Sequence, residues 1–296
     1  MAKARPAPEL RVALLSYGNT SYDQARGWVR VDCPFTTDLD GLSAKLDAVK
    51  TNGGDEYVAR VVKEALTSLD WTPSNKALKV VFVAGNEAAT QDPKFTLEQV
   101  FADAIAKGIQ VNTIYCGGPT DPDASGWRKA STLADGQFAC IDKDHGTVAL
   151  ATPQDAKLAE LSAKLNATYL GYGAHGKDRR EAQESGDRLA DNLAPSAAAE
   201  RAGAKSGKCY ENSDWDLVDG VQNKQMDLSK LKDEELPQEM RNLDAAGRKA
   251  YVEQKGQERA KLQEEIGKLG KERESYLRDE MKKQGVNDEK SLDHAI

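Results

Sequence analysis

A short polar group at the end of an apolar run is the first place to look for chemistry in this sequence. Gly85, Asn86 and Glu87 directly follow residues 80–84, which are all apolar. An unbroken apolar run of this length predicts a strand that is buried on both faces, in the middle of a parallel sheet. Open α/β sheets bind their ligands beyond the carboxyl ends of the strands. We therefore expect any ligand site at that edge of the sheet.

The other residue types that commonly carry catalysis show no catalytic spacing. The three histidines lie outside the predicted strands, and none of them accompanies a nucleophile elbow or a metal-binding spacing. Gly117 and Gly118 follow a predicted strand but are not part of a GxGxxG pattern, so a dinucleotide fingerprint is absent. The four cysteines form no CxxC pair, which argues against a zinc site or a disulfide framework, and the first three are expected to be small buried side chains. The sequence therefore predicts a protein that is not an enzyme.

Composition limits the classes of partner. The 296 residues carry a net charge of −7, which argues against a nucleic-acid surface. No apolar run reaches the roughly 18 residues of a membrane span, and residues 1–6 lack the apolar core of a signal peptide. A hydrophobic content of 39% is enough for one good core but thin for two. We expect one globular domain and one polar, elongated part.

The first half of the chain alternates strands and helices. Residues 10–17 and 28–33 predict an antiparallel hairpin at a sheet edge. The remaining segments predict, in chain order, helices at 37–49 and 55–69, a strand at 79–84, a helix at 96–108, and strands at 109–116 and 137–142. Short connections in this order favour right-handed crossovers. Residues 1–150 thus predict a doubly wound α/β domain with a mostly parallel sheet.

The second half reads as helical and highly charged. Residues 151–207 predict a helical connector, and residues 208–296 a charged helical C-terminal region that ends in one long helix from residue 244. Its apolar residues fit a heptad seam that is interrupted at Arg273; the seam consists of Leu262, Ile266, Leu269 and Tyr276. Two interpretations stay open: a coiled coil, or a solvated helix that packs on a neighbouring element.

Five segments of the first half, taken together, resemble a von Willebrand factor type A domain. They are residues 10–17, 36–40, 52–56, 80–87 and 108–117, and their order carries the resemblance more than any one motif. The tail from Ser213 is similar to the charged extension of a group of uncharacterised bacterial proteins that carry this domain. The resemblance implies a non-enzymatic protein-binding module, and an exported or periplasmic location for a full-length form.

The resemblance also implies a divalent-cation adhesion site at the carboxyl edge of the sheet. Family members hold a Mg²⁺-like cation with an Asp-x-Ser-x-Ser loop, a threonine in a glycine-rich loop and an aspartate after the fourth strand, since hard cations prefer oxygen ligands. The matching positions here are Asp55 and Glu56 in the glycine-rich loop and Asn86 after the strand, with Glu87 nearby. The site is thus a degenerate one. Alternatively, Asp55 and Glu56 cap a helix and Asn86 caps a turn.

The family's first strand and its Asp-x-Ser-x-Ser loop have no counterpart in this sequence. In the family that strand lies between the strands expected here at 10–17 and 79–84. Its absence would leave unpaired peptide groups on two buried strand edges, each costing on the order of 1–3 kcal/mol. We hypothesise an amino-terminal truncation, with Met1 an internal methionine. An in-frame stop codon directly upstream of Met1 would count against this hypothesis.

Two functions are consistent with these observations. In the first, the sheet edge binds a protein partner of unknown identity, and the helical tail spaces or assembles the domain. In the second, the protein is a structural or assembly factor of a larger complex, whose C-terminal helices bind while the α/β domain is scaffold.

Overall fold

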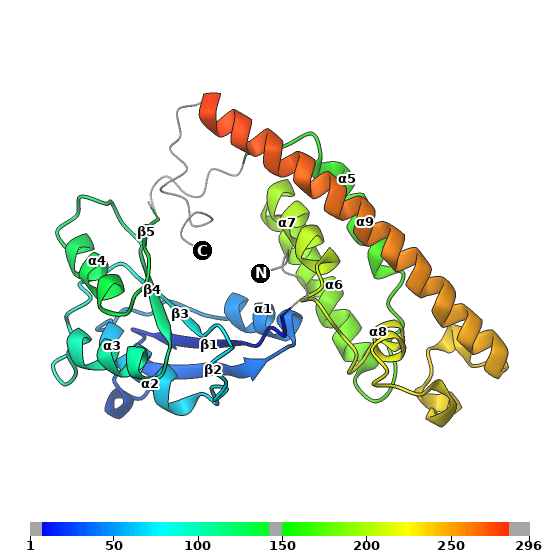
Figure 1. Ribbon diagram of the computed structural model, residues 1–296, viewed down its shortest axis with the longest axis horizontal. Coiled ribbons are helices and arrows are strands. Elements are labelled where there is room, and N and C mark those ends of the chain that lie inside the picture. Colours follow the sequence, from blue (N-terminus) through cyan, green and yellow to red (C-terminus); the bar gives the residue numbers. More distant parts are fainter. Residues whose placement is uncertain (1–7, 142–149, 284–296) are drawn as a thin grey trace. The chain divides into compact units, whose positions relative to one another are not determined.

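The computed structural model describes residues 8–141 and 150–283, which form two compact units (Figure 1). The described part of the α/β unit comprises residues 12–36, 45–141 and 281–283. The described part of the helical unit comprises residues 8–11, 37–44 and 150–280. Residues 151–207, predicted as a connector, and residues 208–280 of the predicted C-terminal region therefore share one unit. Residues 37–44, expected in the α/β domain, belong to the helical unit.

The strands of the α/β unit form two separate sheets. Strands β1 (Val12–Tyr17) and β2 (Val29–Thr36) pair antiparallel, as the hairpin prediction required, with two register shifts. The other sheet is parallel, in the order β3-β4-β5. Its strands are β3 (Val80–Gly85), β4 (Gln110–Tyr115) and β5 (Phe138–Cys140). The structure thus confirms a mixed α/β class with a small parallel sheet.

The prediction that β3 is a central, doubly buried strand is wrong for this sheet. β3 lies at its edge, and Phe82 is 44% exposed. The central strand is β4, whose sequence is more polar but whose residues from Val111 to Tyr115 are all buried. Two of its polar side chains are satisfied internally, because Thr113 donates to the Trp127 carbonyl (2.9 Å) and Asn112 accepts from the Gln137 N–H (2.7 Å). Once a polar side chain is hydrogen-bonded, burial costs it little.

Three helices provide most of the apolar core of the α/β unit. They are α2 (Val58–Ser68), α3 (Leu97–Ala106) and α4 (Ala124–Leu133). α2 contacts β1, β2 and β3 through its apolar face, and Trp127 of α4 is fully buried. α3 begins as predicted at Thr96, whose hydroxyl accepts from the Gln99 N–H (3.3 Å). A single-turn 3₁₀ helix, η1 (Gln24–Arg26), precedes β2.

The helical unit consists of short and long helices packed around two apolar clusters. Its elements are the first residues of α1 (Leu39–Asp47), then α5 (Asp155–Asn166), α6 (Gly176–Leu193), α7 (Pro195–Ser206), α8 (Leu217–Gln222), the 3₁₀ helices η2 (Leu228–Lys230), η3 (Asp233–Glu235) and η4 (Gln238–Met240), and α9 (Ala245–Lys283). One cluster gathers around Leu158 and Trp215, the other around Leu217 and Met240. The predicted helical connector is interrupted before Pro195, which fits at the first position of a helix but not in its interior.

The long helix α9 packs its predicted apolar seam inside the helical unit. Ile266 is fully buried in the cluster around Leu158, and Leu262 and Leu269 pack against that cluster. Arg273, which appeared to interrupt the seam, is buried on the same helix, and its Nε donates to Asp155 (2.8 Å). This packing favours the second interpretation of the seam. Among the described residues, none of the helices has the length and apolar character needed to cross a bilayer.

Candidate functional site

The carboxyl ends of β1, β3 and β4 carry a group of polar side chains, which we call the strand-end site: Tyr17, Glu56, Asn86, Glu87 and Cys116. Tyr17 is the last residue of β1, Asn86 and Glu87 follow β3, and Cys116 follows β4. Glu56 enters from the loop before α2. The structure therefore places polar groups at the edge of the sheet where the sequence predicts a ligand site.

Glu56 is the centre of this site. Its Oε2 accepts a hydrogen bond from the Asn86 N–H at 3.3 Å. Two glycines make room for its side chain: a Cβ atom at Gly18 would lie 2.8 Å from Glu56 Cγ, and one at Gly85 would lie 2.8 Å from Glu56 Oε2. The N-cap residue of α2 is Tyr57, which makes no side-chain capping bond. Glu56 therefore reaches across to the strand ends and does not cap its helix.

Tyr17 links the two sheets at this edge. Its hydroxyl donates to the Ala84 carbonyl oxygen at 2.7 Å, although β1 and β3 belong to separate sheets. A Cβ atom at Gly85 would lie 2.7 Å from the Tyr17 hydroxyl, so only a residue without a side chain fits there. The tyrosine thus satisfies a carbonyl that no strand within residues 8–141 and 150–283 pairs.

The electrostatics of the strand-end site favour a positive ligand. Burial, together with the charge of Glu87, raises the pKa of Glu56, against hydrogen bonds from the Asn86 and Glu87 N–H groups. Burial and the negative charge of Glu56 raise the pKa of the Cys116 thiol. Burial also raises the pKa of Tyr17, and the charges of Glu56, Cys116 and Glu87 add to this increase. A cation or a basic side chain would lower the pKa of Glu56 and gain affinity from doing so.

The residues proposed as cation ligands are only partly brought together. Asp55 is one residue from Glu56, but its Oδ2 accepts from the Tyr57 hydroxyl (2.8 Å). Asn86 contributes its main-chain N–H to Glu56. Within residues 8–141 and 150–283, no group of three or more His, Cys, Asp or Glu side chains is placed to hold a metal ion. These residues do not form the oxygen shell that Mg²⁺ requires, so the cation stays a prediction and no argument below depends on it.

Tyr17 and Cys116 were not identified from the sequence as site residues. The available signal was positional, since both stand at the carboxyl end of a predicted strand. No motif marks them, because their role depends on a pairing of strand ends that the sequence does not display.

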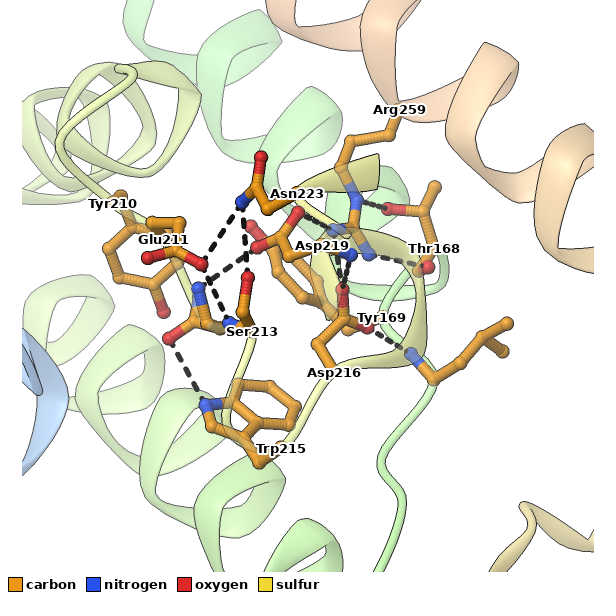
Figure 2. Close-up of polar contacts among 12 residues, drawn as sticks. Thr168, Tyr169, Tyr210, Glu211, Ser213, Trp215, Asp216, Asp219, Asn223 and Arg259 are labelled. Atoms are coloured by element: carbon orange, nitrogen blue, oxygen red, sulfur yellow. Dashed lines mark hydrogen bonds and ion pairs between the residues drawn. The ribbon is translucent and has the colours of Figure 1, made fainter. Parts of the chain in front are cut away.

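The helical unit contains a second polar cluster around Arg259 of α9 (Figure 2). The guanidinium donates to the hydroxyl of Thr168 (3.0 Å) and to its carbonyl (2.7 Å). It also donates to Asp216 (2.7 Å) and to Asp219 (2.6 Å), at the start of α8. Its carbon lies 4.0 Å from the centre of the Tyr169 ring. Arg259 thus ties α9 to α8 and to the segment after α5.

The two carboxylates of this cluster are themselves fixed by the backbone. Asp216 accepts from the Leu170 N–H (2.6 Å) and caps α8 through the Asp219 N–H (2.9 Å). Asp219 accepts from the Asn212 N–H (3.0 Å). Burial raises the pKa of Asp219 to about 6, with the charge of Asp216 adding to the effect and that of Arg259 opposing it. Because its polar groups satisfy one another, the cluster is suited to stabilising the unit.

A third group of charges lies among α5, α6 and α7. Lys205 has no exposed surface, and its Nζ donates to Ser162 (3.1 Å) and Asp187 (2.6 Å). Burial lowers the pKa of Lys205, against the charge of Asp187. Arg201 also pairs with Asp187 and donates to Asp40 (2.8 Å). A pocket of about 240 Å³ beside this group has Ser162, Asp187 and Arg201 in its lining.

The sequence matches no known protein family and no curated protein.

Proposed function

We propose that this protein is a non-enzymatic protein-interaction protein whose α/β unit, which resembles a type A domain, binds a partner at the strand-end site. The fold part of this proposal is a type A strand order with one strand position between β1 and β3. It is supported by their membership of separate sheets and by the Tyr17–Ala84 bond that joins them.

The observation that carries the proposal is the position of Glu56. Its carboxylate is half-buried and sits at three strand ends, where it accepts hydrogen bonds from the Asn86 and Glu87 N–H groups. The nearby charge of Glu87 works against ionisation of Glu56. A lysine, an arginine or a bound cation from a partner would relieve this repulsion, since opposite charge favours the ionised carboxyl. Charge pairs of this kind chiefly determine specificity and the rate of association.

A second candidate function assigns binding to the helical unit and leaves the α/β unit as scaffold. The feature in its favour is the outward side of α9, where charged side chains such as Lys249 and Glu253 are exposed and form only a long ion pair of 3.9 Å. Such a pair contributes little to stability, so these charges are available to a partner.

Site-directed photo-crosslinking separates the two candidates. A photoreactive phenylalanine analogue is placed at Asn86 in one version of the full chain and at exposed Lys261 of α9 in another. The first proposal predicts a specific crosslinked partner at position 86, which disappears when Glu56→Lys is added. A partner that crosslinks at position 261 and is indifferent to Glu56→Lys would instead support the second candidate.

A further inference from the structure

The pocket of about 240 Å³ in the helical unit is lined by α5, α6 and α7 (Figure 1). Four polar side chains form its inner wall, which we call the floor: Ser162, Asn166, Asp187 and Arg201. Ser162 is buried, and the side chains of Asp187 and Arg201 are only 15% and 16% exposed. A water molecule occupies roughly 30 Å³ in the liquid, so the pocket holds about eight groups of that size. This volume suits one small molecule.

A buried lysine lies directly behind the floor. Lys205 has no exposed surface, and its Nζ donates to Ser162 (3.1 Å), to Asp187 (2.6 Å) and to Asn166. Burial lowers the pKa of Lys205, against the charge of Asp187. Burial opposes ionisation of Asp187 as well, but the charge of Lys205 and its hydrogen bond lower the pKa of this carboxyl. Ionisable groups with shifted pKa values around a pocket are typical of binding sites.

Every acceptor oxygen on the floor already receives a hydrogen bond. The two carboxylate oxygens of Asp187 accept from Arg201 on one side and from Lys205 and Asn166 on the other. The hydroxyl oxygen of Ser162 and the amide oxygen of Asn166 accept from Lys205. A ligand that brings further donors to the floor would therefore find its acceptors occupied.

Several donors on the floor are, by contrast, unused. Arg201 donates through Nε to Asp187 and through Nη2 to Asp40 and to the Gln183 carbonyl. Within residues 8–141 and 150–283, neither its Nη1 nor the hydroxyl hydrogen of Ser162 has an acceptor. These donors can bind a carboxylate, because hydrogen bonds in which both partners are charged are among the stronger ones.

The mouth of the pocket carries the opposite preference. Glu184 and Asp191 face one guanidinium there, that of Arg188, so two carboxylates stand against one cation. Glu184 pairs with Arg180 at 3.3 Å, but Asp191 is exposed and has no hydrogen bond or ion pair with any residue that the structure describes. An acidic mouth above a floor of donors matches a ligand with an ammonium group at one end and a carboxylate at the other.

We propose that this pocket binds a free α-amino acid with a short side chain, whose carboxylate accepts from Ser162 and Arg201 and whose ammonium group faces Asp191. The alanines among the lining residues leave room for an apolar or small polar side chain. The pocket belongs to the helical unit, so the inference does not depend on the function proposed for the strand-end site.

NMR titration of the nitrogen-labelled full chain with glycine, l-alanine, l-serine and l-valine tests the inference. At least one of them should shift the side-chain amide of Asn166 and the backbone amides of Ala163 and Arg188, while the amide of Glu56 in the α/β unit stays unchanged. The best-bound amino acid is then compared with its carboxamide, which lacks the carboxylate, and with its N-acetyl derivative, which lacks the ammonium group. Each derivative should bind about tenfold more weakly, as expected for loss of a charged hydrogen-bonding partner.

Three variants of the full chain test the two ends of the ligand. Ser162→Ala removes a floor donor and should weaken binding about tenfold. Asp191→Asn removes the acid at the mouth and should weaken binding about threefold, as expected for an exposed charge pair. The matched control is Glu181→Gln, an exposed acid of the same helix outside the pocket lining, which should bind as the wild type does. Asp191 and Glu181 are exposed, so circular dichroism of both variants should stay unchanged.

Three results would overturn the inference. The first is the absence of any shift at the pocket residues with all four amino acids up to about 20 mM, well above a millimolar dissociation constant. The second is equal binding of the amino acid and its two derivatives, or equal effects of Asp191→Asn and Glu181→Gln. The third is binding of inorganic phosphate as tight as that of the amino acid, which would identify a plain anion site.

Discussion

Replacement of Arg259 by methionine removes the one cation of the cluster in Figure 2 while keeping a long apolar side chain. Asp216 is fully buried, and both it and Asp219 lose their ion pair. Removing one partner of a buried ion pair lowers the free energy of unfolding by about 3–5 kcal/mol, because the remaining charge is left uncompensated. In a unit of this size, that loss lowers the melting temperature by roughly 10–20 °C. Asp219, whose pKa burial already raises, should then take up a proton more readily, so the loss should shrink at low pH.

Urea unfolding followed by far-ultraviolet circular dichroism measures this effect, and amide exchange in α8 and α9 assigns it to the helical unit. The matched control is Lys261→Met, which makes the same change of charge on an exposed turn of the same helix. Its free energy of unfolding should change by less than about 0.5 kcal/mol. If Arg259→Met proved no more destabilising than this control, or if its deficit did not depend on pH, the role assigned to the cluster would be refuted.

Three further predictions follow from the geometry. Gly85→Ala places a methyl group 2.7–2.9 Å from the Tyr17 hydroxyl, Glu56 Oε2 and the Trp127 ring, so it should cost about 1–3 kcal/mol in thermal unfolding. The control Gly126→Ala meets nothing closer than 3.8 Å and should be neutral or slightly stabilising; equal effects would contradict the packing described. Asp219 has a pKa of about 6 in the folded protein, above its unfolded value, so its contribution to the free energy of unfolding should increase as the pH falls through 6. Carbon NMR of the carboxyl group checks this, and a midpoint near 4 would be inconsistent with it. Partner binding through ionised Glu56 should weaken on acidification at a higher pH than an ordinary glutamate allows, because burial and Glu87 raise its pKa; titration calorimetry across pH tests this, and a Glu56→Gln variant should not show it.

Much of the α/β unit could be predicted from the sequence because its signals are local. Apolar runs located β1 and β3, and the helix predicted at 96–108 located the start of α3. The order of strands within the sheet was not predicted correctly. A run of apolar residues marks a strand that can be buried on both faces, but burial of β4 depends on partners for Asn112 and Thr113 that are distant in sequence.

The candidate site was predictable in position and less so in detail. The rule that ligands lie beyond strand ends identified the edge, and Glu56 and Asn86 do meet there. The same loop residues also fit helix capping. Only the position of Glu56 in the fold shows that it reaches the strand ends and does not cap α2. Likewise, Arg273 reads as a break in an apolar seam until its partner Asp155 is known. Charges that are buried in pairs leave no periodic trace in a sequence.

The most direct test of the central claim is the affinity of the crosslinked partner for three versions of the full chain: wild type, Glu56→Gln and Glu56→Lys. With the partner bound at the strand-end site, Glu56→Lys should weaken binding by about a hundredfold and Glu56→Gln by about tenfold, as expected for loss of an interfacial charge pair. Equal affinity of all three, with unchanged circular dichroism, would contradict the claim that this carboxylate binds the partner.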